Sequence, residues 1–460
     1  MDESVATVAE QLLDRTRAFV REERLPGAAA GVVTRAGLAW AGAVGFADLA
    51  TARRTDAHTL YRIASNTKVF TAIGVLQLRD EGRLRLDDPL VVHLPEFAAA
   101  TNPFGPIEDV TIRRLLTHES GLQGEHPYAD LTRPAELRRE QVLAALDRVR
   151  VTIPPSSASK YSNIGFDLLG EMAARLNGGD YEEVLHRRVL RPLEMAATTC
   201  HPAGDLEDRC AVGYDVREHS DVLRPARVLD PDLMPGCGML WSTVADLARF
   251  LAFAMTVDRW SDASHPVLSP GSLAEMQDCR ILTGESPPAL QGLAWYSEAA
   301  PDGSPWLGHA GFVPGFISRT LFRPGDGLGV IVLLNGVADA GKLAMELATL
   351  AVGALRGRPE PEPSAPPAAP PAEAERLLGL YQDDDDHSNT VRVEWRDGQV
   401  TLVGERDADV LVATGDALVW TVRSGRPAGE AACFLTDDRG VVTGLNVAGY
   451  PYRRLRAERV

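Results

Sequence analysis

A serine and a lysine stand three residues apart in the stretch RIASNTKVF, residues 62–70. If a helix begins at Ser65, the serine is its N-cap residue and Lys68 lies one turn along on the same face, where its amine can meet the hydroxyl. The positive end of the helix dipole and burial both disfavour a charged lysine, which predicts a lowered pKa for Lys68. An amine of that kind can take the serine proton and make the serine a nucleophile.

The Ser-x-x-Lys spacing is a weak signal when it stands alone. A second pair, Ser157 and Lys160, lies in the Pro/Ser-rich stretch PPSSASKYSN, where no helix is expected. The first pair is joined by two later triplets, Tyr-Ser-Asn at 161–163 and His-Ala-Gly at 309–311. A tyrosine beside a lysine can shuttle a proton, and an asparagine can hold a substrate amide. A glycine on an edge strand lets an acyl group approach the backbone closely.

The elements that must position these groups mix helical and strand periods. Alternating or apolar runs predict strands at 27–35 and 37–49, and two more around a Pro-Gly-Asp-Gly turn within 318–335. Buried helices are predicted at 66–82 and, behind a Thr-x-x-Asp capping box, at 242–255. The pattern predicts an α/β (α+β) domain whose sheet is built from both ends of the domain. A mostly helical region, about 80–300, is inserted between them and leaves a cleft beside the sheet.

A Pro-rich segment marks the domain boundary. GRPEPEPSAPPAAPPAE, residues 357–373, holds seven prolines and is expected to be an extended spacer between a catalytic domain, 1–356, and a C-terminal domain, 374–460. The tail alternates in short runs, and TVRVEWRDGQVTLV predicts a hairpin that turns at Asp397-Gly398. The tail is therefore expected to be a small all-β unit, a barrel or a sandwich.

Composition excludes several classes of function. The net charge of -17 opposes binding to nucleic acid, and no apolar run reaches the ~18 residues of a membrane span. The first residues lack the basic and apolar regions of an export signal, which predicts a cytoplasmic protein. Five scattered cysteines without a Cys-x-x-Cys motif indicate neither a disulfide framework nor a zinc site.

The order SNTK, YSN and HAG, with the segments TIRRLLTHESGL and GMLWSTVADLARF, resembles the class C β-lactamase and penicillin-binding-protein superfamily over about residues 20–340. The resemblance implies that superfamily's antiparallel sheet flanked by helices, with a helical subdomain. It also implies that Ser65 is the acylated nucleophile, Lys68 its general base, and Tyr161 the group that returns a proton to the leaving group. No cofactor or metal is implied.

The same resemblance implies a set of substrate contacts. The oxyanion hole would consist of the backbone N–H groups of Ser65 and Phe312. Substrate would contact the asparagine of YSN and the residues of the HAG triplet, which are Asn163, His309, Ala310 and Gly311.

One departure from the superfamily changes the expected substrate. His309 stands where β-lactamases and cell-wall carboxypeptidases usually carry a lysine that binds the substrate's carboxylate. A neutral imidazole binds a carboxylate poorly, so efficient penicillin hydrolysis or D-Ala-D-Ala trimming is not expected. With its Pro-rich spacer and a tail that looks like a lipocalin-type barrel, the chain most resembles penicillin-binding-protein-type thioesterases. Those stand-alone cytoplasmic enzymes take a nonribosomal peptide from its carrier thioester and close it into a ring.

Two alternatives stay open. The first is hydrolysis by a cytoplasmic D-amino-acid peptidase or esterase, since water and an amine compete for the same acyl-enzyme. The second is an acyl-trapping ligand sensor, against which the tyrosine argues. Arg453 and Arg454 either bind a peptide carboxylate or are solvated surface residues of the barrel without a role in substrate binding. The second interpretation is favoured. The expected partners are a peptide or peptidyl thioester and the carrier protein of a peptide synthetase. The Arg-rich stretch 133–150 either meets that carrier or is a solvated helix face.

Overall fold

The chain forms two compact units in a computed structural model. The first unit comprises Met1–Leu282 with Leu290–Glu360, and the second comprises Thr283–Ala289 with Pro361–Val460. Most of the expected spacer, residues 357–373, lies outside the described residues. The structure describes residues 3–455 apart from 127–138, 217–221, 227–234, 257–266, 284–288, 301–302, 357–369, 384–389, 397–398, 404–407, 415–416, 423–430, 438 and 448–449.

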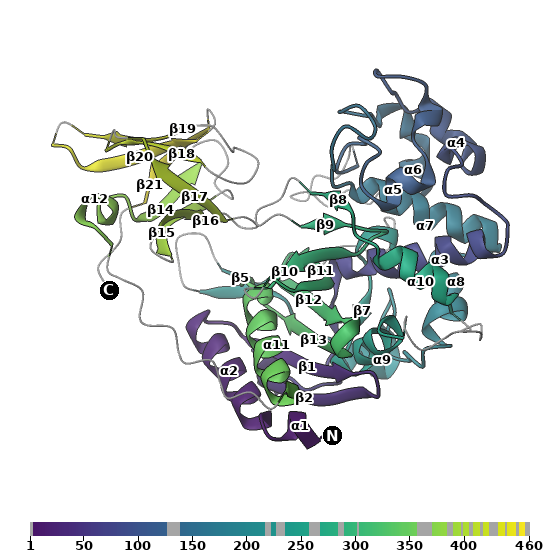
Figure 1. Ribbon diagram of the computed structural model, residues 1–460, viewed down its shortest axis with the longest axis horizontal. Helices are drawn as coiled ribbons and strands as arrows, with labels where there is room; N and C mark the ends of the chain where they lie inside the picture. Colours follow the sequence, from purple (N-terminus) through teal and green to yellow (C-terminus); the bar gives the residue numbers. More distant parts are fainter. Residues whose placement is uncertain are drawn as a thin grey trace. The chain divides into compact units, whose positions relative to one another are not determined.

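A nine-stranded antiparallel sheet forms the centre of the first unit (Figure 1). Its strand order is β3-β2-β1-β13-β12-β11-β10-β9-β8, so strands from the start and the end of the unit pair in the middle, as predicted. The strands are β1 (Gly27–Thr34), β2 (Gly37–Asp48), β3 (Arg53–Arg54), β8 (Ile281–Leu282), β9 (Leu290–Gln291), β10 (Tyr296–Ala299), β11 (Pro305–Val313), β12 (Phe316–Arg323) and β13 (Leu328–Leu334).

The two central strands are apolar on both faces because each face meets its own core. Successive side chains of a strand point to opposite faces. Ala29 of β1 and Ile331 of β13 accordingly belong to the core that also holds α9 (Val244–Ala254). Their neighbours along the strands face the core shared with α2 (Ala9–Glu22) and α11 (Ala340–Arg356) (Figure 1). The predicted turn between β12 and β13 is present, and Gly327 adopts the positive φ of 64° that it requires.

The inserted region is mostly helical, as expected. It contributes α3 (Thr67–Asp80), α4 (Leu90–His93), α5 (Ile112–Leu116), α6 (Arg139–Ala144), α7 (Asn163–Asn177), α8 (Tyr181–Leu185) and α10 (Pro270–Gln277). Two small sheets join it, β4 (Tyr61–Arg62) with β7 (Trp241–Ser242) and β5 (Tyr214–Val216) with β6 (Leu223–Pro225). Thr243 caps α9 by accepting a hydrogen bond from the Asp246 backbone, whereas the Asp246 carboxylate binds Ala197 N. Only half of the predicted capping box is therefore formed.

The second unit contains a closed eight-stranded barrel, which confirms the predicted all-β tail. The strands follow one another around the barrel, and β14 pairs with both β15 and β21, so no sheet edge is left open. This is the up-and-down order that lipocalins have. The strands are β14 (Gly379–Asp383), β15 (Thr390–Arg396), β16 (Gln399–Val403), β17 (Ala408–Ala413), β18 (Val419–Val422), β19 (Ala431–Thr436), β20 (Val442–Val447) and β21 (Tyr450–Arg454).

The predicted hairpin within 390–403 is the β15–β16 pair, in which Trp395 lies opposite Val400. Its turn, Asp397-Gly398, lies outside the described residues. All five cysteines are unpaired. In the part of the chain that the structure describes, no helix combines the length and apolar character of a membrane span.

Candidate active site

Ser65 lies in a tight 3₁₀ turn, Ala64–Asn66, which leads directly into α3 and is called the serine turn below. Ala64 has a positive φ of 47°, a conformation that a non-glycine residue rarely adopts. The prediction that Ser65 caps the helix is wrong. Asn66 occupies the N-cap position, and no side chain caps the helix, because the turn already supplies carbonyl acceptors to the first N–H groups of α3.

Three hydrogen bonds attach the serine turn to the sheet. Ser318 Oγ of β12 donates to Ile63 O at 2.6 Å and accepts from Asn66 Nδ2 at 2.8 Å. Thr320 Oγ1 donates to Asn66 Oδ1 at 2.7 Å. Gly311 of β11 faces the same place, where an added Cβ would lie 2.2 Å from Ile63 O. The sequence predicted a close approach of an acyl group at this glycine, but the structure shows the backbone next to Ser65 filling that space.

The predicted contact between Lys68 and Ser65 is present. Lys68 is fully buried, and its Nζ lies 3.1 Å from Ser65 Oγ, 2.6 Å from Asn163 Oδ1 and 2.9 Å from Cys237 O. These three acceptors match the three N–H donors of an ammonium. A neutral amine would keep its bonds to Asn163 and Cys237 and accept the hydroxyl of Ser65 instead. Transfer of one proton therefore changes a single hydrogen bond.

The direction of the Lys68 pKa differs from the prediction. Burial lowers the pKa of Lys68, but Tyr161, Cys237 and Asp167 act in the opposite sense, and the pKa of Lys68 is raised overall. The Tyr161 ring centroid lies 4.7 Å from Lys68 Nζ. The sequence argument for the pKa of Lys68 included the helix dipole and burial but not these three groups, all of which come from distant parts of the chain. The resting lysine is therefore an ammonium at neutral pH.

Tyr161 packs against a buried histidine that the sequence argument did not identify as a site residue. The rings of Tyr161 and His118 have centroids 4.3 Å apart, and His118 has a positive φ of 57°. His118 Nδ1 accepts from Ser162 N at 3.2 Å, so Nε2 carries the proton, and this buried Nε2 finds no hydrogen-bond partner among the described residues. Burial, followed by Lys68 and His309, lowers the pKa of His118 well below its usual range.

His309 lies on β11 and is a second neutral imidazole at this site. Its side chain is buried, and Nδ1 donates to Ala310 O, which leaves Nε2 as a buried acceptor that has no partner within the part of the chain that the structure describes. Burial and then Lys68 lower the pKa of His309 to about 3. At neutral pH the third motif therefore carries no positive charge. This agrees with the expectation that a substrate carboxylate is not the group recognised there.

Asn163 begins α7 and is hydrogen-bonded through both of its side-chain polar atoms. Its Oδ1 accepts from Lys68, and its Nδ2 donates to Glu125 Oε1 at 2.5 Å. The sequence argument missed Glu125, because a glutamate in a loop carries no motif of its own. It also missed Asp167, whose Oδ1 accepts from Cys237 N at 2.8 Å and so holds the carbonyl that Lys68 contacts.

Two further predicted site residues, Phe312 and Ala310, lie on β11. Phe312 is on β11 opposite Ile317, close to the serine turn, which contacts this strand. Ala310 on the same strand is exposed. The second serine–lysine pair is not in a helix, and Lys160 N donates to His118 O at 2.7 Å.

The two arginines near the chain end belong to β21 of the barrel. The Arg454 guanidinium donates to the carbonyls of Leu378, Arg376 and Val442, all in the same unit. Arg453 is exposed and lies opposite Gln382 of β14. A substrate contact by Arg453 stays a prediction.

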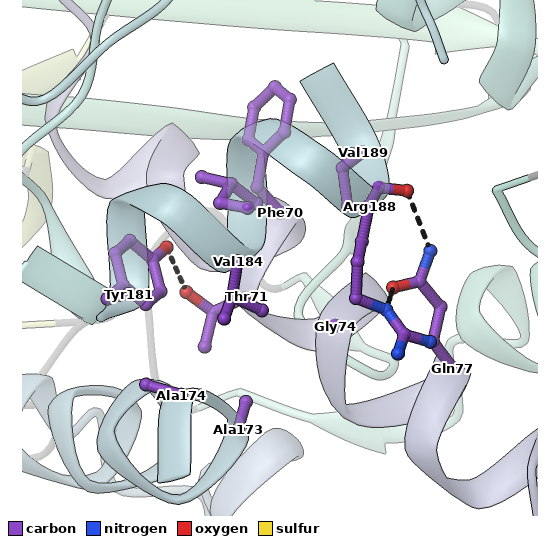
Figure 2. A pocket seen from close by; sticks show the side chains of 11 residues that line it. Phe70, Thr71, Gly74, Gln77, Ala173, Ala174, Tyr181, Val184, Arg188 and Val189 are labelled. Atoms are coloured by element: carbon purple, nitrogen blue, oxygen red, sulfur yellow. Dashed lines mark hydrogen bonds between the residues drawn. The ribbon is translucent and has the colours of Figure 1, made fainter. Parts of the chain in front are cut away.

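A small cavity lies behind α3, on the side of the helix that Thr71 and Gly74 occupy (Figure 2). Its volume of about 10 Å³ is room for a single water molecule. Figure 2 shows that its polar side chains already pair with one another, since Thr71 Oγ1 lies 2.7 Å from Tyr181 Oη and Arg188 Nε donates to Gln77 Oε1 at 3.0 Å. This cavity is therefore too small and too fully paired to hold a substrate.

Comparisons with known proteins match most of the chain. The family model described as Beta-lactamase matches residues 10–354. Protein flp of Staphylococcus aureus (strain N315) is 26% identical over 318 residues, which are 69% of this chain and 61% of that protein. The chain thus spans about three fifths of the length of that relative.

Two solved structures share the fold. The octameric penicillin-binding protein homologue from Pyrococcus abyssi has a TM-score of 0.66 at 22% identity and covers 98% of this chain and 100% of its own. A D-stereospecific amidohydrolase from Streptomyces sp. has a TM-score of 0.61 at 24% identity, over 73% of this chain and 97% of its own. At these identities the likeness concerns the fold alone.

Proposed function

The chain belongs to the beta-lactamase family of serine acyl-transfer enzymes and hydrolases, and we propose that it off-loads and macrocyclises a nonribosomal peptidyl thioester. The observation that carries the acyl-transfer step is the 3.1 Å contact between Lys68 Nζ and Ser65 Oγ. It holds a hydroxyl beside a buried amine at the start of a helix. This is the arrangement in which a serine becomes a nucleophile.

In the first half-reaction, Ser65 Oγ attacks the thioester carbonyl. The C–Oγ bond forms, the C–S bond breaks, and the serine proton passes through the Lys68–Tyr161 pair to the departing thiolate. At rest the Lys68 ammonium orients Ser65 by donating to Oγ. For the attack the Lys68–Tyr161 pair first gives up one proton to solvent, so that it can accept the serine proton and pass it to the thiolate. Lys68 Nζ lies 4.7 Å from the centroid of the Tyr161 ring, which brings Tyr161 into this transfer. The backbone N–H groups of Ser65 and Phe312 hold the oxyanion, and one such donor is commonly worth ~100- to 1,000-fold in rate.

In the second half-reaction, the peptide's own amine attacks the acyl-enzyme. The C–N bond forms, the C–Oγ bond breaks, and one amine proton returns to Ser65 through the same pair. Water in place of the amine gives the linear acid. The serine site serves both reactions, and the partition between them is set by which nucleophile reaches the acyl group.

Two features support a peptidyl donor rather than a substrate that ends in a free carboxylate. His309 is neutral and buried, so the third motif lacks a cation. The additional barrel has the closed strand order of lipocalin-type units. The predicted donor is a thioester on a carrier protein, in the cytoplasm.

The test is incubation with linear peptidyl thioesters that end in a D-residue, followed by mass spectrometry of the products. Cyclic peptide from the wild type and none from Ser65→Ala supports the proposal. Only hydrolysed or unchanged peptide across a broad panel contradicts it.

Hydrolysis by a D-specific peptidase or esterase is the second candidate. It is supported by the serine site itself, in which Lys68 Nζ lies 3.1 Å from Ser65 Oγ, because water can attack the acyl-enzyme formed there as well as an amine can. The Streptomyces protein with the same fold is a D-stereospecific amidohydrolase, which makes this chemistry a natural comparison. Linear acid released over many turnovers, without cyclic product, would identify this activity. A single turnover that leaves a lasting adduct would instead identify an acyl-trapping sensor.

A further inference from the structure

Glu125 places a carboxylate at the edge of the reacting groups. Its side chain is exposed, and Oε1 accepts one hydrogen bond from Asn163 Nδ2. Asn163 in turn contacts Lys68, which contacts Ser65, so Glu125 is the third side chain from the nucleophile in a chain of hydrogen bonds. A carboxylate has about four acceptor sites. The single bond from Asn163 leaves capacity for a donor from the substrate.

Among the described residues, which exclude the neighbouring segment 127–138, Glu125 forms no direct ion pair, and the partner that hydrogen-bonds its carboxylate is the neutral amide of Asn163. Partial desolvation raises the pKa of Glu125, Asp167 acts in the same sense, and Asn163, Lys68 and His126 act in the opposite sense. The pKa is raised overall, so the surroundings disfavour the carboxylate. A cation brought by the substrate would relieve this cost, because an opposite charge nearby favours the ionised form.

The remaining polar atoms at this site also favour a donor over an acceptor. Asn163 Oδ1 accepts from Lys68 and one N–H of Nδ2 is taken by Glu125, so an amide carbonyl of the substrate can use only the second N–H, beside the Glu125 carboxylate. His309 Nε2 is a buried acceptor to which no described residue donates. A substrate group with N–H donors can hydrogen-bond to the Glu125 carboxylate and to His309 Nε2. A substrate carboxylate would be repelled by the negative charge of Glu125.

We propose that Glu125 is a binding site for a free amine of the substrate. This inference rests on the proposed acyl-transfer function. The amine has two possible sources with the same chemistry. It is either the α-ammonium of the residue that acylates Ser65, or the amine that attacks the acyl-enzyme. In the second case Glu125 accepts one N–H, and the nitrogen lone pair forms the new C–N bond.

The experiment uses the full chain and compares the wild type with Glu125→Gln in two arms. The first arm measures kcat/KM for the N-acetylcysteamine thioesters of D-alanine and N-acetyl-D-alanine. If the amine is that of the acyl donor, the variant loses about 10- to 100-fold on the free-amine donor and little on the acetylated one, as expected for one charge-assisted hydrogen bond. The acetylated donor controls for folding.

The second arm gives the acetylated donor with glycinamide as the added nucleophile and measures the ratio of amide to acid product. If the amine is the attacking one, the variant lowers this ratio by a similar factor. Glu119→Gln is the matched control, since this nearby glutamate contacts Thr117 Oγ1 at 2.9 Å instead of Asn163, and both ratios should stay at wild-type values.

The outcomes separate the amine site from the function on which it rests. A Ser65 adduct in the intact-mass spectrum of Glu125→Gln, with both ratios unchanged, overturns the amine site and leaves acyl transfer standing. An equal loss on both donors also overturns it, because that result reports a general disturbance of Asn163. Absence of any adduct in the wild type with either donor overturns the proposed function and this inference together.

Discussion

Replacing Gly311 with alanine tests whether β11 positions the nucleophile through close backbone contact. An added Cβ would lie 2.2 Å from Ile63 O, 2.5 Å from Ser318 Oγ and 3.0 Å from Ala64 Cβ. Real Cβ atoms essentially never approach a neighbour within 3.0 Å. The carbonyl oxygen of Ile63 must therefore retreat by about 0.8 Å, and it belongs to the backbone that leads into the serine turn.

Two effects of different size follow from this displacement. Overpacking of a well-filled site costs typically about 1–3 kcal/mol of unfolding free energy. A misplacement of about 1 Å at reacting groups costs on the order of 100-fold in rate. Ile63 O is also the acceptor for Ser318 Oγ, so its shift strains the hydrogen bonds that hold Asn66. We expect Gly311→Ala to lose more in acylation of Ser65 than in stability.

The assay follows acylation of Ser65 by intact-mass spectrometry after rapid mixing with an activated acyl donor, alongside urea unfolding. Gly74→Ala is the matched control on α3, since among the described residues no atom beyond its chain neighbours and the adjacent helix backbone lies within 4 Å of the Cβ that it adds. That helix position should gain about 0.5–1 kcal/mol and keep the wild-type acylation rate. If Gly311→Ala acylates within about threefold of the wild type, the close contact does not position Ser65, and the reasoning fails.

Three further predictions concern other parts of the molecule. Ser65→Ala should form no acyl adduct and lose at least about 1,000-fold in turnover, measured with an activated ester. Folding lowers the pKa of His309 from 6.5 to about 3 and also lowers the pKa of His118. Below pH 6.5 the unfolded chain therefore binds more protons than the folded protein. Acidification should then lower the free energy of unfolding by up to about 1.4 kcal/mol per pH unit for each histidine. His309→Gln should reduce this slope in urea unfolding between pH 5 and 7, and an unchanged slope would show that His309 is not held neutral. Arg454→Ala should destabilise the barrel by about 1–3 kcal/mol through lost hydrogen bonds to the carbonyls of Arg376 and Leu378, measured by thermal unfolding, and an unchanged unfolding temperature would contradict this role.

Features that depend on local spacing were predictable from the sequence. The contact between Ser65 and Lys68 is one of these, because residues three apart in a helical turn meet whatever surrounds them. The central strands and the buried α3 follow from apolar periodicity, and short alternating runs predicted an all-β tail, a barrel or a sandwich, of which the structure shows the closed barrel. The exact start of α3 was not predicted, because the 3₁₀ turn Ala64–Asn66 precedes the helix and Ser65 lies in that turn instead of at the N-cap position.

Features that depend on contacts between distant segments were decided by the tertiary structure alone. The pKa of Lys68 is raised because the fold brings Tyr161 and Asp167 to it, although burial by itself acts in the opposite direction. Glu125 joins the site only because its loop meets the first residue of α7. Composition and order along the chain thus determined the chemical groups and their local geometry. Their protonation and the character of the substrate site depend on charges and acceptors that become neighbours only when the chain folds, because electrostatic interactions act through space and not along the sequence.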